Sequence, residues 1–159
     1  MKLIVLSLTS VLFSSAVFSA DVCSKKAVED KVNEICKQVS AKGDAIKSEW
    51  PAGLLYKNCG DNYLWVQDTD AEVKMVMHPI KQRLNGQALV KQTDENKFAL
   101  FADFDKQAKA KADGAWAEYV WPKPGQEKAT PKIAYVKMCK LPSGGAWVVG
   151  SGIWKEDVK

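Results

Sequence analysis

The last third of the chain contains three strand-like runs separated by short turn-forming segments, and this pattern limits the possible folds most. The runs cover residues 116–121, 132–140 and 146–154 and are rich in Trp, Tyr, Val and Ile. Two segments rich in Pro and Gly separate them: Pro122-Lys123-Pro124-Gly125 and Leu141-Pro142-Ser143-Gly144-Gly145. Because short turns of this kind join neighbouring antiparallel strands, we predict an antiparallel meander.

A long amphipathic helix is predicted over residues 22–46. Its apolar side chains recur at steps of four, three, four and seven residues: Val28, Val32, Ile35, Val39 and Ile46. Asp21 or Ser24 can cap the start of this helix, and Gly43 marks where it can fray.

Shorter elements are expected between the helix and the meander. Residues 63–67 predict a strand, and residues 73–77 predict a second one that ends before Pro79, which has no backbone donor. Residues 98–112 predict a helix that Asp94 can cap and Gly114 stops at its C′ position. A helix at the start and a sheet at the end indicate an α+β fold rather than a parallel α/β fold.

The first twenty residues have the layout of a secretory signal peptide. Lys2 precedes an apolar run, Leu3 to Phe13, and small residues follow as far as Ala20. The apolar run is too short to span a bilayer as a helix, and no later stretch is long and apolar enough. We therefore expect cleavage after Ser19 or Ala20, no lipid anchor, and a single domain over residues 21–159 that is periplasmic or secreted.

The four cysteines of the expected mature chain are Cys23, Cys36, Cys59 and Cys139. An oxidising compartment favours disulfides between them. Cys23 and Cys36 lie on one predicted helix, roughly 20 Å apart, which is too far for a bond; the other pairings are open. The net charge of +4 is spread without a basic stripe, so we expect no nucleic-acid partner.

Several motifs follow one another along the chain: Tyr63-Leu64-Trp65-Val66, Met77-His78-Pro79, Leu84-Asn85-Gly86, Trp121-Pro122-Lys123-Pro124-Gly125, Pro131 to Lys137 and Trp147 to Trp154. In this order they resemble the single Cache domain family of bacterial chemoreceptors and sensor kinases, especially its second single-Cache subgroup. The resemblance implies a PAS-like fold, in which a long N-terminal helix packs on a five- to six-stranded antiparallel sheet.

The same resemblance implies a sensor of short-chain carboxylates such as acetate, propionate, lactate or pyruvate, with no enzymatic activity. Because the sequence ends directly after the last predicted strand, we expect a separate membrane receptor or sensor kinase to carry the signal. The N-terminal helix is a candidate surface for a homodimer.

A carboxylate pocket needs hydrogen-bond donors on a largely apolar wall. The resemblance makes His78, the only histidine, a donor to the carboxylate, with a near-neutral pKa that would make binding pH-sensitive. The other candidate ligand-binding residues are Trp65, Arg83, Tyr119, Trp121, Lys132 and Tyr135. Tyr119 and Trp121 share a strand face, whereas Lys132 and Tyr135 would need a bulge or a late strand start to line one pocket.

Other interpretations of these residues are structural. Aromatic side chains commonly fill sheet faces, and we expect Trp116, Trp147 and Trp154 to be core residues. A single histidine with cysteines held in disulfides gives no metal site, and Gly150-Ser151-Gly152 lacks the spacing of a nucleophile elbow. We therefore expect no catalytic residues and no cofactor. The rival hypothesis is a pocketless module that docks on an envelope protein.

Overall fold

An antiparallel sheet is the centre of the structure, a computed structural model that describes residues 24–50 and 62–158. Within these residues the strand order is β2-β1-β5-β4-β3. The strands are β1 Leu64–Asp68, β2 Met75–Met77, β3 Ala115–Pro122, β4 Ala129–Lys140 and β5 Ala146–Trp154. The predicted meander is confirmed, since β3 pairs with β4 and β4 with β5 in regular antiparallel register.

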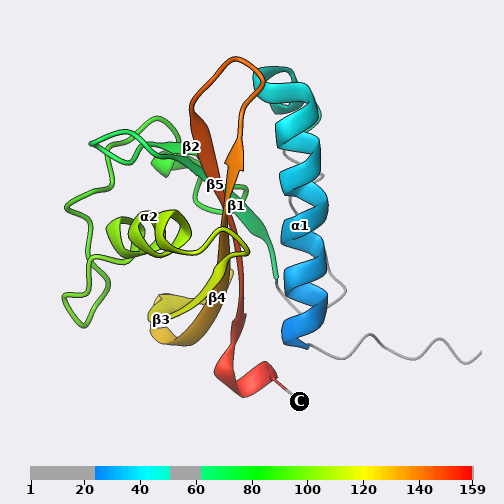
Figure 1. Cartoon of the computed structure of the whole chain (residues 1–159). Coiled ribbons are helices and arrows are strands. Elements are labelled where there is room, and N and C mark those ends of the chain that lie inside the picture. Colours follow the sequence, from blue (N-terminus) through cyan, green and yellow to red (C-terminus); the bar gives the residue numbers. More distant parts are fainter. Residues whose placement is uncertain (1–23, 51–61, 159) are drawn as a thin grey trace, which may run out of the picture.

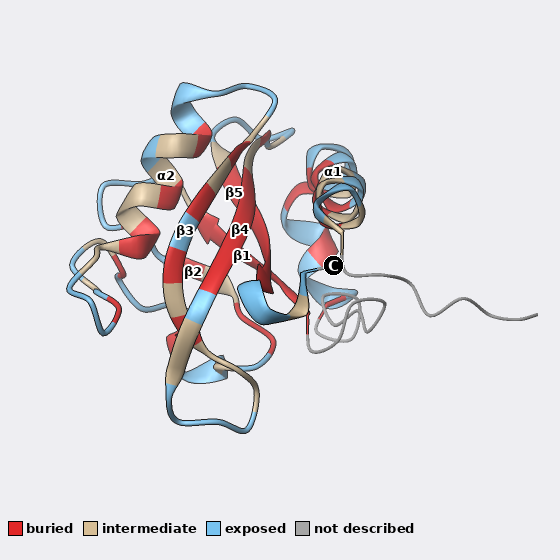
Figure 2. Cartoon of the chain, turned by 90° about the horizontal axis from the view of Figure 1, so that it is seen from below, coloured by how far each residue is buried: buried red, intermediate tan, exposed pale blue. Residues whose placement is uncertain are grey.

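The two helices cover opposite faces of this sheet (Figure 1). α1 (Lys25–Lys42) lies on one face, and α2 (Leu100–Ala110) lies on the other. Figure 2 shows buried residues along the strands, between the helices. Each face therefore has its own apolar cluster, one beneath α1 and one beneath α2. The α+β class and the helix-on-sheet arrangement agree with the prediction.

α1 begins after Ser24, one of its two predicted caps, and ends at Lys42, before the predicted end at residue 46 and next to Gly43, where fraying was predicted. The Ser24 side chain accepts a hydrogen bond from the Ala27 backbone N–H at 3.1 Å, which satisfies one free donor of the first turn. The helix ends before Gly43, whose φ of 56° favours a residue without a Cβ, and a 3-10 helix, η1 (Gly43–Ser48), follows. None of the helices among the described residues combines the length and hydropathy needed to span a bilayer.

A disulfide between Cys36 and Cys139 ties α1 to β4. The two Cα atoms are 5.3 Å apart, and 103 positions separate the residues in the sequence. Cys36 is thus not bonded to Cys23, as helix geometry predicts. Cys23 and Cys59 lie outside the described residues, as do the expected signal peptide and the alternative cap Asp21.

Two local predictions, one before and one after α2, were wrong. Asp94 does not cap α2: its carboxylate accepts backbone N–H groups of Asn96, Phe98 and Val120, and so ties this loop to β3. Gly114 is not the C′ residue, because α2 ends four residues earlier. It has a φ of 99°, and a Cβ there would lie 2.3 Å from the Tyr135 hydroxyl oxygen.

The second short strand is shorter than predicted. Val73 has a φ of 51°, and its N–H donates to the Asp70 carbonyl, so this residue belongs to a turn. β2 therefore begins at Met75. A 3-10 turn, η3 (Gln82–Leu84), follows it, and another, η4 (Lys155–Asp157), follows β5.

Candidate functional site

A small cavity of about 10 Å³ lies between α2 and the sheet. It is about the size of one water molecule. Aromatic and aliphatic side chains form most of its wall: Tyr63, Trp65, His78, Leu100, Phe101, Phe104, Tyr119 and Trp121. The polar groups among them are one imidazole, two indole N–H groups and two phenol hydroxyls, and no carboxylate of the described chain lines the cavity.

A glycine in β5 makes room for the floor of this cavity. A Cβ built on Gly150 would lie 2.4 Å from the Trp65 ring, so only glycine lets that ring lie against the neighbouring strand. Trp65 then packs against Phe104 of α2, with ring centroids 5.2 Å apart. The floor of the cavity is therefore tightly packed.

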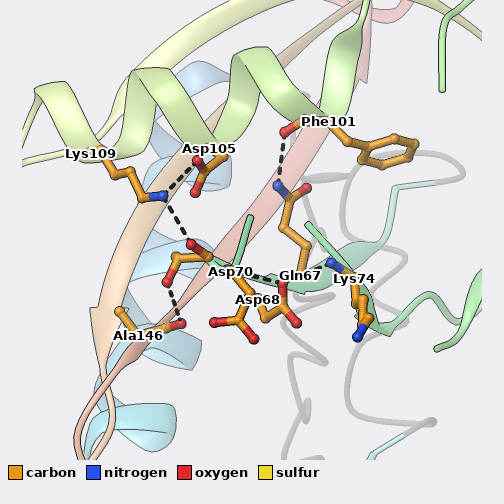
Figure 3. Close-up of polar contacts among 9 residues, drawn as sticks. Gln67, Asp68, Asp70, Lys74, Phe101, Asp105, Lys109 and Ala146 are labelled. Carbon is orange, nitrogen blue, oxygen red and sulfur yellow. Dashed lines mark hydrogen bonds and ion pairs between the residues drawn. The ribbon is translucent and has the colours of Figure 1, made fainter. Parts of the chain in front are cut away.

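Polar contacts from the end of β1 hold α2 over the sheet (Figure 3). The buried amide of Gln67 donates from Nε2 to the Phe101 carbonyl at 2.9 Å. Lys109 near the other end of α2 donates to the Thr69 carbonyl at 3.0 Å and pairs with Asp105 at 2.8 Å. Because these contacts fix α2 at both ends, they also fix the aromatic roof of the cavity.

His78 is held in one orientation and one protonation state. Its Nδ1 accepts a hydrogen bond from the Lys81 backbone N–H at 3.0 Å, so in the neutral ring the proton is on Nε2, which can donate. Burial, with the charges of Lys132 and Lys81, lowers the pKa of His78 to about 3. The expectation of a near-neutral pKa was therefore wrong, chiefly because the ring is buried.

Lys132 is fully buried, and its Nζ has no hydrogen-bond partner among the described residues. The nitrogen lies 3.7 Å from the centroid of the Trp154 ring and 4.2 Å from that of Tyr63. Gly152 provides the space, since a Cβ there would lie 2.8 Å from the Lys132 side chain. Burial and the charge of Lys81 lower the pKa of Lys132 well below its usual value.

The two ring contacts do not offset the burial of this amine. A cation over an aromatic ring gains about 0.5–2 kcal/mol, whereas a buried charge without a counter-ion costs several kcal/mol. Lys132 is thus unfavourable for stability as it stands. A buried ionisable group of this kind beside a cavity is a candidate for binding an opposite charge.

The structure places four of the predicted ligand-binding residues around the cavity: Trp65, His78, Tyr119 and Trp121. Lys132 does not line the cavity itself: it packs against the ring of Tyr63, which does. Its register partners Tyr119 and Trp154 place it on the α2 face of the sheet.

Two predicted residues lie elsewhere. Tyr135 belongs to the α1 face, where it packs against Trp116 and its hydroxyl donates to the Asp113 carbonyl. The register of β4 contains no bulge between Lys132 and Tyr135, so side chains three apart face opposite sides. Arg83 is exposed, on a surface pocket of about 230 Å³ that also includes Trp121.

The sequence-based site lacked Tyr63 and three residues of α2: Leu100, Phe101 and Phe104. Tyr63 could have been predicted from the sequence, because it is two positions from Trp65 and so shares its face. The α2 residues carry an amphipathic pattern, but the pattern does not say which part of the sheet they cover. No group of three or more His, Cys, Asp or Glu side chains in the described ranges can hold a metal ion.

Comparisons with known proteins agree with this architecture. A family model described as Cache domain matches residues 36–159. The methyl-accepting chemotaxis protein McpP of Pseudomonas putida strain KT2440 is 35% identical over 99 residues, which are 62% of this chain and 17% of that protein. The chain therefore corresponds to a small part of that relative.

Three solved structures share the fold. A periplasmic sensor domain of a chemotaxis protein has a TM-score of 0.62 at 34% identity, covering 82% of this chain and 89% of that one. A Cache chemosensory domain, described as the structural basis for carboxylic acid recognition, has the same score and coverage at 27% identity. A methyl-accepting chemotaxis protein of Vibrio parahaemolyticus has a TM-score of 0.61 at 25% identity, covering 86% and 88%.

Proposed function

The chain belongs to the Cache domain family, and from that premise we propose that it is an extracytoplasmic sensing domain for short-chain carboxylates. Acetate, propionate, lactate and pyruvate are the proposed ligands. The observation that carries the proposal is the buried Lys132 Nζ, which has no acceptor among the described residues and lies next to the cavity that His78 lines.

In the proposed complex, the carboxylate lies between Lys132 and His78. Lys132 Nζ and the Nε2–H of His78 donate to its oxygens, and such charge-assisted hydrogen bonds are roughly twice as strong as neutral ones. The Tyr119 hydroxyl is a further donor in the wall. The apolar end of the acid then faces the phenyl rings of α2, Phe101 and Phe104.

Binding in this position requires the wall to move. A cavity of about 10 Å³ is too small for a two-carbon acid, and the Tyr63 ring lies between it and Lys132. Trp121 is the wall residue that also reaches the surface pocket with Arg83, and Lys81 Nζ lies 4.0 Å from its ring centroid. We propose that the acid enters by displacing Tyr63 or Trp121.

The small cavity also favours a second candidate function. A scaffold whose pocket is filled by its own side chains would act as a docking module on an envelope protein. In either case, we propose that the protein acts outside the cytoplasm with a membrane receptor or sensor kinase, and that α1 is the surface for a homodimer. The two candidates differ in whether an acid stabilises the fold.

A thermal-shift titration with the four acids separates these functions. A ligand at one hundred times its Kd should stabilise the fold by about 2.7 kcal/mol. Lys132→Met should abolish the shift, whereas Lys140→Met, an exposed lysine on the same strand, should leave it unchanged. If no acid moves the transition of the wild-type protein, the docking module is the better account.

A further inference from the structure

The groups that face Lys132 supply no negative charge. From the β1 side comes the Tyr63 ring, and from the segment after β2 the neutral His78. The neighbour on β3 is Tyr119, whose pKa is raised by burial, so its hydroxyl keeps its proton. Lys81 adds a like charge, which works against a second cation here.

The remaining elements packed near Lys132 add no counter-ion either. β5 contributes the Trp154 ring, and α2 contributes only apolar side chains to the cavity wall. The carboxylates of η4, Glu156 and Asp157, pair with Lys123, at 2.6 and 2.9 Å. Among the described residues, therefore, no carboxylate is placed to balance a charge on Lys132.

We propose that binding of a carboxylate at this site is coupled to the uptake of one proton by Lys132. This inference rests on the proposed function. Without a bound acid, the buried amine has no acceptor and is neutral. An incoming carboxylate anion supplies the missing charge, the amine takes one proton from solvent, and the product is a neutral ammonium–carboxylate pair with no net buried charge.

Lys132 is the base that fits this role best. His78 would have to accept its second proton on Nδ1, which already accepts the Lys81 backbone N–H at 3.0 Å. The hydroxyls of Tyr63 and Tyr119 are already protonated, because burial raises both pKa values. The lowered pKa of Lys132 agrees with its geometry, since its first cause is burial.

Coupling of this kind makes the domain respond to acid concentration and pH together. One proton taken up per ligand means that affinity rises about tenfold for each pH unit of acidification. This dependence holds between the lowered pKa of Lys132 in the free protein and its higher pKa beside the carboxylate. The same acid concentration would then occupy more of the sensor in acidic surroundings.

Isothermal titration calorimetry with propionate at one pH, in several buffers of different ionisation enthalpy, measures the number of protons taken up. We expect about one proton per ligand in the wild-type protein and in His78→Gln. In Lys132→Met, any residual binding should take up none. Lys140→Met is the matched control and should behave as wild type.

Each other outcome has a distinct meaning. Binding to wild-type protein without dependence on the buffer overturns the proton coupling but leaves carboxylate binding intact. Proton uptake that disappears in His78→Gln, or persists in Lys132→Met, overturns the assignment to Lys132. No binding heat and no thermal shift with any of the four acids overturns the proposed function itself.

Discussion

Replacing Lys132 by Met should stabilise the fold while removing its ligand response. Methionine has a similar length and fills the same channel beside Gly152. The change removes a fully buried amine without a hydrogen-bond partner, and such a group costs about 1–3 kcal/mol. The lost ring contacts with Tyr63 and Trp154 are replaced by sulfur–aromatic contacts of about 0.3–1.5 kcal/mol each.

The net expectation is a gain of about 1–3 kcal/mol near neutral pH, measured by urea denaturation without ligand. The pH dependence has a definite sign. The pKa of Lys132 is lower in the folded than in the unfolded protein, so the unfolded chain binds more protons and wild-type stability rises with pH up to about 10.5. The advantage of Lys132→Met should therefore narrow as the pH approaches that value.

Lys140→Met is the control, because this lysine is exposed on the same strand, and its effect should stay within about 0.5 kcal/mol. A loss of more than about 1 kcal/mol in Lys132→Met, with the control neutral, would show that Lys132 supports the fold. Its burial would then be explained by stability and not by anion binding.

Three further changes test the packing and the electrostatics. Gly150→Ala places a Cβ 2.4 Å from the Trp65 ring. The resulting overpacking should lower the free energy of unfolding by about 1–3 kcal/mol, measured by denaturation, and should abolish the acid-induced thermal shift. An unchanged stability would contradict the tight packing of Trp65 against β5. Replacing both Cys36 and Cys139 by Ser removes a cross-link between residues 103 positions apart. The change should lower the free energy of unfolding by about 2–4 kcal/mol, measured by thermal unfolding. An unchanged stability would show that α1 is held mainly by its apolar contacts. Burial lowers the pKa of His78 to about 3, so the unfolded chain binds more protons than the folded protein between pH 6.5 and 3. Wild-type protein should therefore lose stability faster than His78→Gln as the pH falls through this range. Parallel stability curves for the two proteins would show that His78 is not buried as described.

Much of the fold could be predicted from periodicity. The spacing of apolar residues predicted α1, Ser24 was one of its two predicted caps, and the last three strand-like runs with their turns predicted the meander. The predicted cap of α2 was wrong because the side chain forms a hydrogen bond to a residue distant in the sequence. Asp94 could have capped α2 by its position, but its carboxylate reaches Val120 on β3, which no local pattern shows.

The site could be predicted only in part. The two-residue period of strands placed Tyr119 and Trp121 on one face, and it also separated Tyr135 from Lys132, because the required bulge is absent from the register of β4. The contribution of α2 and the low pKa of His78 depend on which side chains become buried together. That information belongs to tertiary packing and is not visible in residue spacing.

The most direct test of carboxylate binding is a crystal structure of the protein with bound propionate. We expect a cavity beneath α2 that has grown beyond about 10 Å³, with the carboxylate oxygens within roughly 3 Å of Lys132 Nζ and His78 Nε2. Propionate bound only outside this cavity, with Lys132 still against the rings of Tyr63 and Trp154, would contradict the account.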